Sequence, residues 1–482
     1  MKPTRSIKPI ILILPLLLGA CTLGPDYVRP TVDTPIAFKE LDGWKIAQPR
    51  DQEIRGNWWQ IFNDPLLNSL EEQVSISNQN LAQAEARFRQ ARALVQSARA
   101  AYFPSVGGSA AVTRSSGSSR GSSQSTVSGG TSSGPSTSHS LALDANWEPD
   151  LWGRVRRTVE TNEANAQASF ADLEATRLSM QAQLAQNYFQ LRMLDTQQQL
   201  LDRTIVDYQR SLQLTQNQYA VGVVAKETVI QAQTQLKTTQ TQAIDIGVQR
   251  AQLEHAIALL IGKPASVFSI PLASLTVTVP PPPSGVPSTL LERRPDIAAA
   301  ERRIASANAQ IGVAKAAYFP ALTLSASGGF ASSSFTNWLS APSRFWSLGP
   351  ALAQTIFDGG ARKAQTEQAV ANYDASVAAY RQTVLTGFQE VEDNLAALRI
   401  LEQEAAMQDE ALQYARQSVA LTTNQYKAGI VSYLNVIQVQ ATALDSERNA
   451  LNILNRRLSA SILLIKALGG GWDAARSTAD NS

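Results

Sequence analysis

The sequence predicts a mainly α-helical protein of two similar halves, each of which carries one membrane β-hairpin. The first observation behind this prediction is a duplication: AAYFP at 100–104 returns at 316–320, and the QY…G pattern at 218–222 returns at 425–429. Each motif recurs after about 210 positions, a period far longer than that of a solenoid repeat. Two halves of this size are expected to complete one closed object rather than to stack in a row.

Long uninterrupted helices are the second observation. Residues 155–219 contain neither proline nor glycine, and their apolar residues fall on the a and d positions of an unbroken heptad frame. Residues 370–426 continue the matching frame in the second half, with Val, Leu, Ala or Tyr at every a position. At a rise of about 1.5 Å per residue, each helix of this length is roughly 100 Å long.

Shorter helices are expected at 77–101 with 225–262, and at 296–317 with 433–468, because each pair nearly equals one long helix in length. An extended two-stranded coiled coil with a single seam is the simpler interpretation of the long helices. A second stripe disfavours it, since a helix with two packing faces can sit between two neighbours and join a ring; the stripe comprises Leu178, Ala182, Ala185 and Phe189.

The two hairpins are predicted from alternating sequence. In the second half Leu322, Leu324 and Ala326 alternate with polar residues, as in a membrane strand of about ten residues. The matching tract at 105–147 is rich in Ser and Gly, and composition alone favours a flexible linker. Its alternating ends and the second copy instead indicate a hairpin with a long disordered loop. Beyond Leu18 no run of about 18 apolar residues occurs, so a bilayer crossing would require a closed β-barrel.

The single cysteine of the chain, Cys21, is explained by its position. A basic start and a short apolar run precede the small residues Gly19 and Ala20, as in a signal peptide. Cysteine directly after them resembles the lipobox of bacterial lipoproteins, which implies a covalent S-diacylglycerol and an N-acyl chain such as palmitate on Cys21. Thr22 in place of an aspartate suggests passage to the outer membrane. A plain signal peptide with a chance cysteine is the alternative.

Composition and motifs argue against catalysis and against several partners. A formal net charge of +2 implies neither nucleic acid nor an anionic membrane surface as a partner. The two histidines have no recognisable catalytic partner, and the GSSRG match to a nucleophile elbow at 117–121 lies in low-complexity sequence. No Walker-type glycine loop exists, and the few Met, Cys and His residues cannot build a soft-metal site. We therefore expect no enzyme activity, no cofactor and no metal.

Several motifs together resemble the outer membrane factor family, the TolC-like channels of tripartite efflux and secretion systems. The resemblance covers essentially the whole chain after residue 20. The motifs that show this resemblance are Cys21 with GPDY at 24–27, the two YFP turns, LLERRPDI at 290–297 with Ala300-Glu301, FDGG at 357–360, and the two QY…G patterns.

The resemblance implies a homotrimer in the outer membrane of a Gram-negative bacterium. Each subunit would give four strands to a shared twelve-stranded β-barrel and its helices to a long periplasmic α-helical barrel, wrapped midway by an equatorial layer. The chain then divides into a lipoprotein signal peptide (1–20), a lipidated segment with an equatorial contribution (21–75), a first repeat (76–262, hairpin about 104–152), an equatorial linker (263–293), a second repeat (294–470, hairpin about 320–357) and a C-terminal tail (471–482).

The helical tips around Gly222 and Gly429 would meet a periplasmic adaptor protein. Related channels often narrow this end with rings of aspartate, but residues 411–429 contain no carboxylate, and their only charges are Arg416 and Lys427. We therefore expect a cationic or neutral tip closed by hydrogen bonds and packing, and no block by micromolar trivalent metal from the periplasmic side. The candidate gate residues are Tyr219, Gly222, Arg416, Leu421, Asn424, Gln425, Tyr426 and Gly429.

The resulting hypothesis is an exit duct that passively conducts drugs or other small toxic compounds from the adaptor and an inner-membrane pump of the resistance-nodulation-division class. The lipobox favours efflux over the first alternative, a type I secretion channel. The second alternative is a non-channel coiled-coil structural lipoprotein, which would not need the two hairpins.

Overall fold

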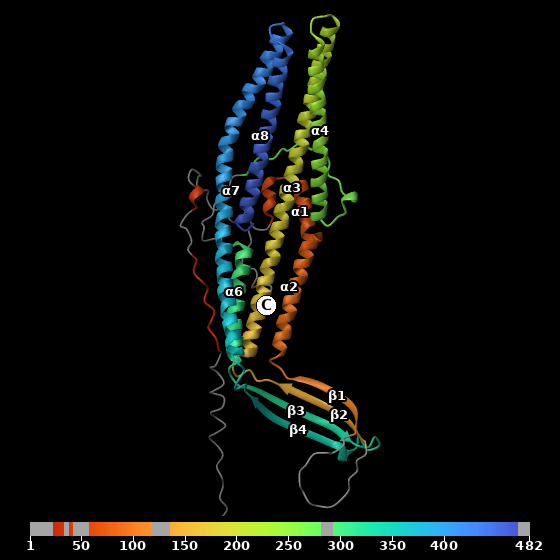
Figure 1. Cartoon of the computed structure of the whole chain (residues 1–482), viewed down its shortest axis with the longest axis vertical. Helices are drawn as coiled ribbons and strands as arrows, with labels where there is room; N and C mark the ends of the chain where they lie inside the picture. Colours follow the sequence, from red (N-terminus) through yellow and green to blue (C-terminus); the bar gives the residue numbers. More distant parts are fainter. Residues whose placement is uncertain (1–22, 33–37, 42–56, 117–134, 281–292, 471–482) are drawn as a thin grey trace, which may run out of the picture. The chain divides into compact units, whose positions relative to one another are not determined.

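The computed structural model describes residues 23–32, 38–41, 57–116, 135–280 and 293–470 (Figure 1). The predicted signal peptide, Cys21, the centre of the first hairpin and the C-terminal tail lie outside these residues.

The chain divides into two compact units. The sheet unit comprises Met1–Pro30, Arg89–Ala166 and Arg302–Ala378, and the helical unit comprises Thr31–Phe88, Gln167–Glu301 and Ala379–Ser482.

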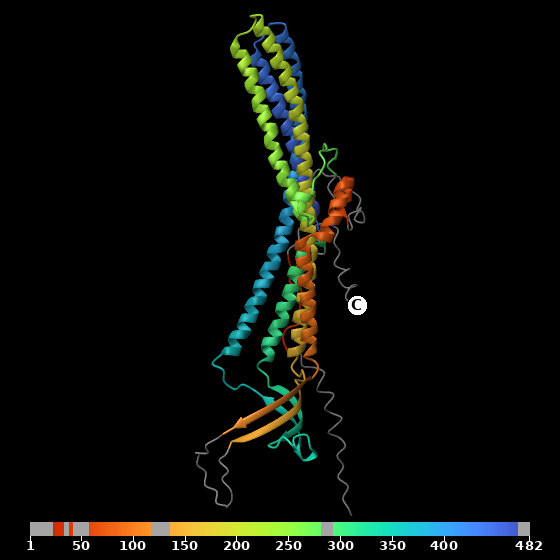
Figure 2. The ribbon, with the colours of Figure 1, turned by 90° about the vertical axis from the view of Figure 1, so that its right-hand side faces the viewer.

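The sheet unit contains four antiparallel strands in the order β1-β2-β3-β4 (Figures 1 and 2). Their bounds are Ser105–Ser115 for β1, Ser136–Trp147 for β2, Ala321–Ser332 for β3 and Arg344–Ala353 for β4. Because β2 also pairs with β3, the hairpins of the two sequence halves join into one sheet. The pairing register is regular along all three ladders, so successive residues point to opposite faces.

The helices repeat in length between the halves. The two long helices, α3 (Arg154–Ala220) and α7 (Ala361–Lys427), each have 67 residues. The returning helices α4 (Lys226–Leu260) and α8 (Tyr433–Ala467) each have 35, and α2 (Gln79–Ala100) and α6 (Pro295–Ala316) each have 22. The predicted mainly helical architecture with a small sheet is thus confirmed. Among the described residues, no helix combines the length and apolarity needed to cross a membrane.

A separate helix precedes the first of the expected shorter helices. The helix expected at 77–101 is α2, and α1 (Pro65–Ser77) comes before it. Asp64 starts α1, because its carboxylate accepts the backbone N–H groups of Leu66 and Leu67 at 2.9 and 3.1 Å. Asn78 separates the helices: its side-chain oxygen accepts two N–H groups at the start of α2, and its amide donates to the Leu260 carbonyl at 2.7 Å.

The largest apolar core lies in the helical unit. A short 3₁₀ helix, Trp58–Phe62, and α1 bury their apolar side chains against α3, α4 and α8. Its largest fully buried members include Trp58, Tyr188 and Phe189, and burying such aromatic side chains dominates the energetics of a core. This core fixes the middle part of α3.

Candidate functional site

The four-stranded sheet has one apolar and one polar face. Residues that oppose one another in the pairing register share a face. The apolar face carries Val106, Ala110, Val112, Leu141, Leu143, Ala145, Leu322, Leu324, Ala326, Phe330, Trp346, Leu348 and Leu352. The other face carries Ser105, Ser109, Thr113, Ser140, Asp144, Asn146, Thr323, Ser325, Ser327 and Ser347, interspersed with Gly and Ala and with one large apolar residue, Phe345.

Large apolar side chains of this sheet are exposed on the single chain. Trp346 is 82% exposed, Leu348 74% and Val106 70%. Exposing so much contiguous apolar surface to water is unfavourable, and such patches mark contacts with membrane or protein. Within the described chain, β1 and β4 each pair with one strand only, so each has an outer edge able to accept a further strand. The sheet is therefore suited to lipid on one face and water on the other.

The segment that follows Cys21 is fastened within the sheet unit. Buried Arg157, in the first turn of α3, donates from Nε to the Leu23 carbonyl at 3.2 Å and pairs with Asp26 at 3.3 Å. Gly24 has φ +103° and packs so closely on Gly312 that an added Cβ would lie 2.6 Å from the Gly312 Cα. The segment that begins at Leu23 is thus held beside the start of α3. Cys21, two positions earlier, lies outside the described residues.

The candidate gate lies at the tips where α3 and α7 end. Gly222 and Gly429 adopt left-handed φ values of +79° and +76°. Each helix ends with the same pair of backbone hydrogen bonds. In α3 the Gly222 N–H donates to the Tyr219 carbonyl, and the N–H of residue 223 donates to the Gln218 carbonyl. In α7 the Gly429 N–H donates to the Tyr426 carbonyl, and the N–H of residue 430 donates to the Gln425 carbonyl. This pair of hydrogen bonds is the Schellman motif. The motif favours glycine because a residue with a Cβ is strained at positive φ.

A hydrogen bond joins the two tips of one chain. Tyr426, which is buried, donates its hydroxyl to the Gln218 side-chain oxygen at 2.5 Å. Its ring lies 5.3 Å from that of Tyr433 on α8. Burial raises the pKa of the Tyr433 phenol to about 12, so this hydroxyl stays protonated at any physiological pH. Gln218 was absent from the candidate residues, although its place in the repeated QY…G pattern could have indicated it.

The other candidates do not gather around this bond. Tyr219 is 46% and Leu421 65% exposed, and Asn424 and Gln425 are not buried either. They remain predicted gate residues, available to other copies of the chain or to a partner.

Arg416 has an acidic partner on the neighbouring helix. The expectation of a cationic or neutral tip was based on the sequence of α7 alone. In the structure, Glu447 on α8 accepts from the Arg416 guanidinium at 2.7 and 2.8 Å. The pair is close to neutral, so Arg416 does not make the tip cationic.

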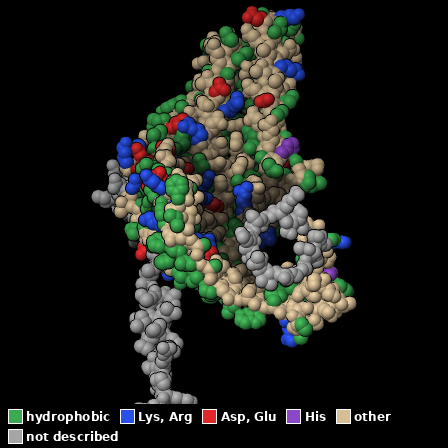
Figure 3. Space-filling view, turned by 60° about the horizontal axis from the view of Figure 1, so that its bottom comes forward, with side chains coloured by type: hydrophobic (Ala, Val, Ile, Leu, Met, Phe, Trp, Pro, Cys, Tyr) green, Lys and Arg blue, Asp and Glu red, His purple; other side chains and the backbone are tan. Residues whose placement is uncertain are grey.

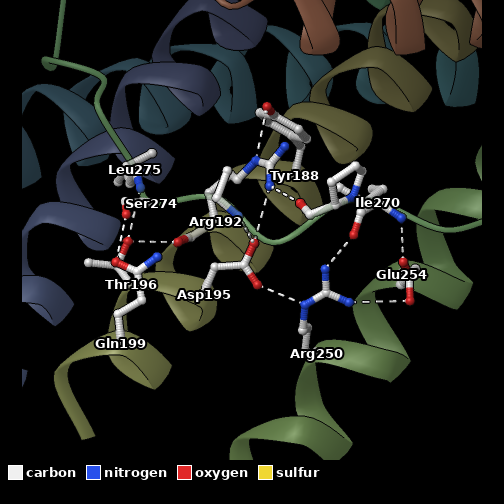
Figure 4. Close-up of polar contacts among 12 residues, drawn as sticks. Tyr188, Arg192, Asp195, Thr196, Gln199, Arg250, Glu254, Ile270, Ser274 and Leu275 are labelled. Atoms are coloured by element: carbon white, nitrogen blue, oxygen red, sulfur yellow. Dashed lines mark hydrogen bonds and ion pairs between the residues drawn. The ribbon is translucent and has the colours of Figure 1, made fainter. Parts of the chain in front are cut away.

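A buried cluster of four charged residues, which we call the lock, lies in the helical unit (Figure 4). It comprises Arg192, Asp195, Arg250 and Glu254. The Asp195 carboxylate is fully buried and pairs with Arg192 at 3.2 Å and with Arg250 of α4 at 2.7 Å. Arg250 also contacts Glu254 at 3.3 Å. Two largely buried cations around one carboxylate compensate charges that would be costly to bury alone.

The lock binds a non-helical segment, residues 270–275, which we call the strap. Arg250 donates to the Ile270 carbonyl at 2.6 Å and Arg192 to the Pro271 carbonyl at 2.7 Å. Asp195 in turn accepts the Ala273 N–H at 3.2 Å. The strap therefore has these backbone groups satisfied by charged side chains, which makes the bonds stronger than bonds between neutral groups. These residues were missed by the sequence analysis.

The second half fastens a different segment at the equivalent position. Arg192 and Arg399 each stand 27 residues before the repeated tyrosines Tyr219 and Tyr426. Arg399 forms an ion pair with Glu40 of the N-terminal segment. The Glu392 carboxylate accepts the backbone N–H groups at positions 39 and 40, at 2.7 and 3.0 Å. Both long helices thus use one repeat position to hold a segment that lies outside the long helices.

Glu71 is an exception to this charge pairing. Its side chain is fully buried in α1, and neither carboxyl oxygen has a hydrogen-bond partner among the described residues. Burial raises the pKa of Glu71 well above its usual value. Folding therefore favours the protonated carboxyl of Glu71. The stability that this carboxyl contributes is fully present below its pKa in the unfolded chain, about 4.3, and is lost as the pH rises through its pKa in the folded chain.

Changing Glu71 to glutamine should raise the free energy of unfolding at pH 8 by about 1–3 kcal/mol, because the amide is neutral and carries no charge that burial disfavours. At pH 4.5 the gain should shrink. Thermal unfolding of the detergent-solubilised protein at both pH values measures this difference. The matched control is Glu72→Gln on the exposed neighbouring position, which should change neither value. Equal gains at both pH values would contradict the assignment.

The charged side chains on one face of the molecule are mixed in sign. On the face shown in Figure 3, basic and acidic side chains are interspersed, without a large patch of one sign. Within the described part of the chain, no group of three or more His, Cys, Asp or Glu side chains could hold a metal ion.

A frame of long duplicated helices with a small two-faced sheet is the architecture of TolC-like outer-membrane channels. The chain belongs to the outer membrane efflux protein family, whose model matches residues 70–263 and 286–470. This is a family of channel proteins rather than of enzymes.

Individual relatives match almost end to end. The chain is 31% identical to the pyoverdine export outer membrane protein OpmQ of Pseudomonas aeruginosa, over 98% of each chain. It is 29% identical to the toluene efflux pump outer membrane protein TtgC of Pseudomonas putida, over 97% of this chain and 96% of that one. The solved outer-membrane channel OprN superposes with a TM-score of 0.84 at 29% identity, over 94% of this chain and 100% of that one.

Proposed function

We propose that three copies of this chain form the outer-membrane exit channel of a tripartite efflux system in a Gram-negative bacterium. The channel would passively conduct drugs or other small toxic compounds that a periplasmic adaptor and an inner-membrane resistance-nodulation-division pump deliver. The names of the relatives, which refer to pyoverdine export and toluene efflux, support small molecules as cargo rather than a secreted polypeptide.

The two-faced sheet is the observation that carries the proposal. An open four-stranded sheet with exposed Trp346 and Leu348 on one face and serines on the other is unstable alone in either water or lipid. Three such sheets joined edge to edge, β4 of one copy to β1 of the next, would give a closed twelve-stranded barrel. Lipid would cover its apolar face, and water would fill the polar interior.

Lipidation of Cys21 completes the proposal. The held segment Leu23–Asp26 lies in the same unit as the membrane sheet, which supports an anchor at Cys21, two positions before it. Two or more acyl chains are needed for a lasting anchor, since each buried CH₂ contributes only about 0.8 kcal/mol. Mass spectrometry of the mature amino terminus tests this modification.

The central experiment measures the oligomer and its conductance. The purified full chain should migrate as a heat-modifiable trimer and conduct ions in a planar bilayer. Tyr426→Phe removes the bond to Gln218, so we expect openings to become about two- to tenfold more frequent. The matched control is Tyr414→Phe on the same helix, where the side chain is 68% exposed.

Each result has a distinct meaning. A monomer without conductance would refute the proposed channel. A conducting trimer with equal opening frequency in wild type and Tyr426→Phe would leave the channel standing and refute the gate.

A further inference from the structure

Asp144 on β2 is distinctive in the sheet. Among the residues of the four described strands, it is the only ionisable residue on the polar face. The other ionisable strand residues, Arg114, His139 and Arg344, share the apolar face and lie at its end nearest the strand-connecting loops. Asp144 instead stands inside the strand, opposite Gly107 on β1 and Ser327 on β3.

The negative charge of Asp144 is not neutralised within the described chain. Its single polar contact there is with the Ser109 hydroxyl, 3.5 Å from Oδ2. Other carboxylates near the sheet are compensated: Glu148 pairs with Arg154 at 2.7 Å, and Asp358 pairs with Arg362 at 2.5 Å. Both residues opposite Asp144 have small side chains, which leaves the half-buried carboxylate partly open to water.

An ionised carboxylate in this position requires water. A charged side chain on the lipid face of a membrane strand is destabilising, most strongly at mid-depth. Asp144 lies on the face of the serines, away from Leu143 and Ala145 on either side of it in the chain. The alternation of the strand therefore directs the carboxylate toward the aqueous side of the sheet.

We propose that Asp144 makes the exit pore selective for cations and cationic cargo. This inference rests on the proposed trimeric channel, in which the three copies of Asp144 form one ring of negative charge in the lumen. Rings of charged side chains set the ion preference of membrane pores by raising the local concentration of counter-ions. Small neighbours such as Gly107 and Ser327 leave room for hydrated ions beside each carboxylate.

The first experiment measures the reversal potential of the purified trimer across a KCl gradient in a planar bilayer. Asp144→Asn should lower the ratio of potassium to chloride permeability by at least about twofold in 0.1 M salt. The effect should weaken at 1 M salt, since the Debye length falls from about 10 Å to about 3 Å. Control variant Ser109→Ala removes the neighbouring hydroxyl without changing charge and should leave the ratio unchanged.

A second experiment places a chosen charge at the same position. Asp144→Cys should lose cation conductance with a positively charged thiol reagent and regain it with a negatively charged one. The matched control is Ala145→Cys on the apolar face, whose labelling should not change the current. The wild-type chain, whose sole cysteine is Cys21, must also be unaffected.

The outcomes separate this inference from the channel itself. Absence of any conductance in the wild type would refute the proposed channel, and with it the ring. Normal conductance with unchanged selectivity in Asp144→Asn, and no effect of either reagent on Asp144→Cys, would refute the ring alone.

Discussion

Changing Asp195 to alanine is expected to lower the free energy of unfolding of the helical unit by about 3–5 kcal/mol. The fully buried carboxylate bonds to Arg192, Arg250 and the backbone of the strap. Its removal leaves two guanidinium groups without their common counter-ion, in a place from which water is largely excluded. Thermal unfolding followed by circular dichroism in detergent measures the loss, and limited proteolysis at residues 270–275 should show that the strap is released.

Asp207→Ala is the matched control. Asp207 lies on the same helix and also pairs with an arginine three residues later, Arg210, but this pair is exposed. Asp207 and Arg210 are 65% and 77% exposed, and such surface pairs contribute about 0–1 kcal/mol. Stability and protease resistance should therefore stay close to wild type. Similar losses in the Asp195 and Asp207 variants would show that the lock does not hold the strap.

The long helices and the hairpins could be predicted from sequence because their signals are local. α3 contains neither proline nor glycine between its ends, and Gly222 marks its end by a backbone conformation that few other residues tolerate. The alternation of β3 shows in consecutive residues from Leu322 onward. Such patterns fix the type of an element whatever packs around it.

The lock could not be predicted, because its members are distant in sequence. Arg250 and the strap meet Asp195 only after α4 has turned back along α3. Arg192 and Asp195 directly follow Leu191 and Leu194, which keep the heptad frame apolar, so the frame gave no sign of a buried charge cluster. The same limit explains Arg416, whose partner Glu447 lies on the neighbouring helix. It also explains the boundary at Asn78, which is held by the distant Leu260 carbonyl.

Gly262→Ala and Gly469→Ala should each destabilise the helical unit by about 2–5 kcal/mol, the sum of left-handed backbone strain and a steric clash. These glycines end α4 and α8 with φ values of +68° and +90°. An added Cβ would lie 2.3 Å from the Ser77 carbonyl oxygen at Gly262, and 2.0 Å from that of Arg293 at Gly469. Backbone atoms cannot move aside as a flexible side chain can, so the neighbouring segment must be displaced.

Gly222→Ala and Gly429→Ala supply matched controls at the tips of the same two helical hairpins. Their φ values of +79° and +76° impose the same backbone strain, but an added Cβ would meet no atom within 4 Å. Their cost should therefore be about 1–2 kcal/mol. Thermal unfolding of all four variants in one detergent separates strain from clash. If the tip variants lose as much stability as Gly262→Ala and Gly469→Ala, strain alone accounts for the effect, and close packing of α4 and α8 on the preceding segments is not what requires glycine.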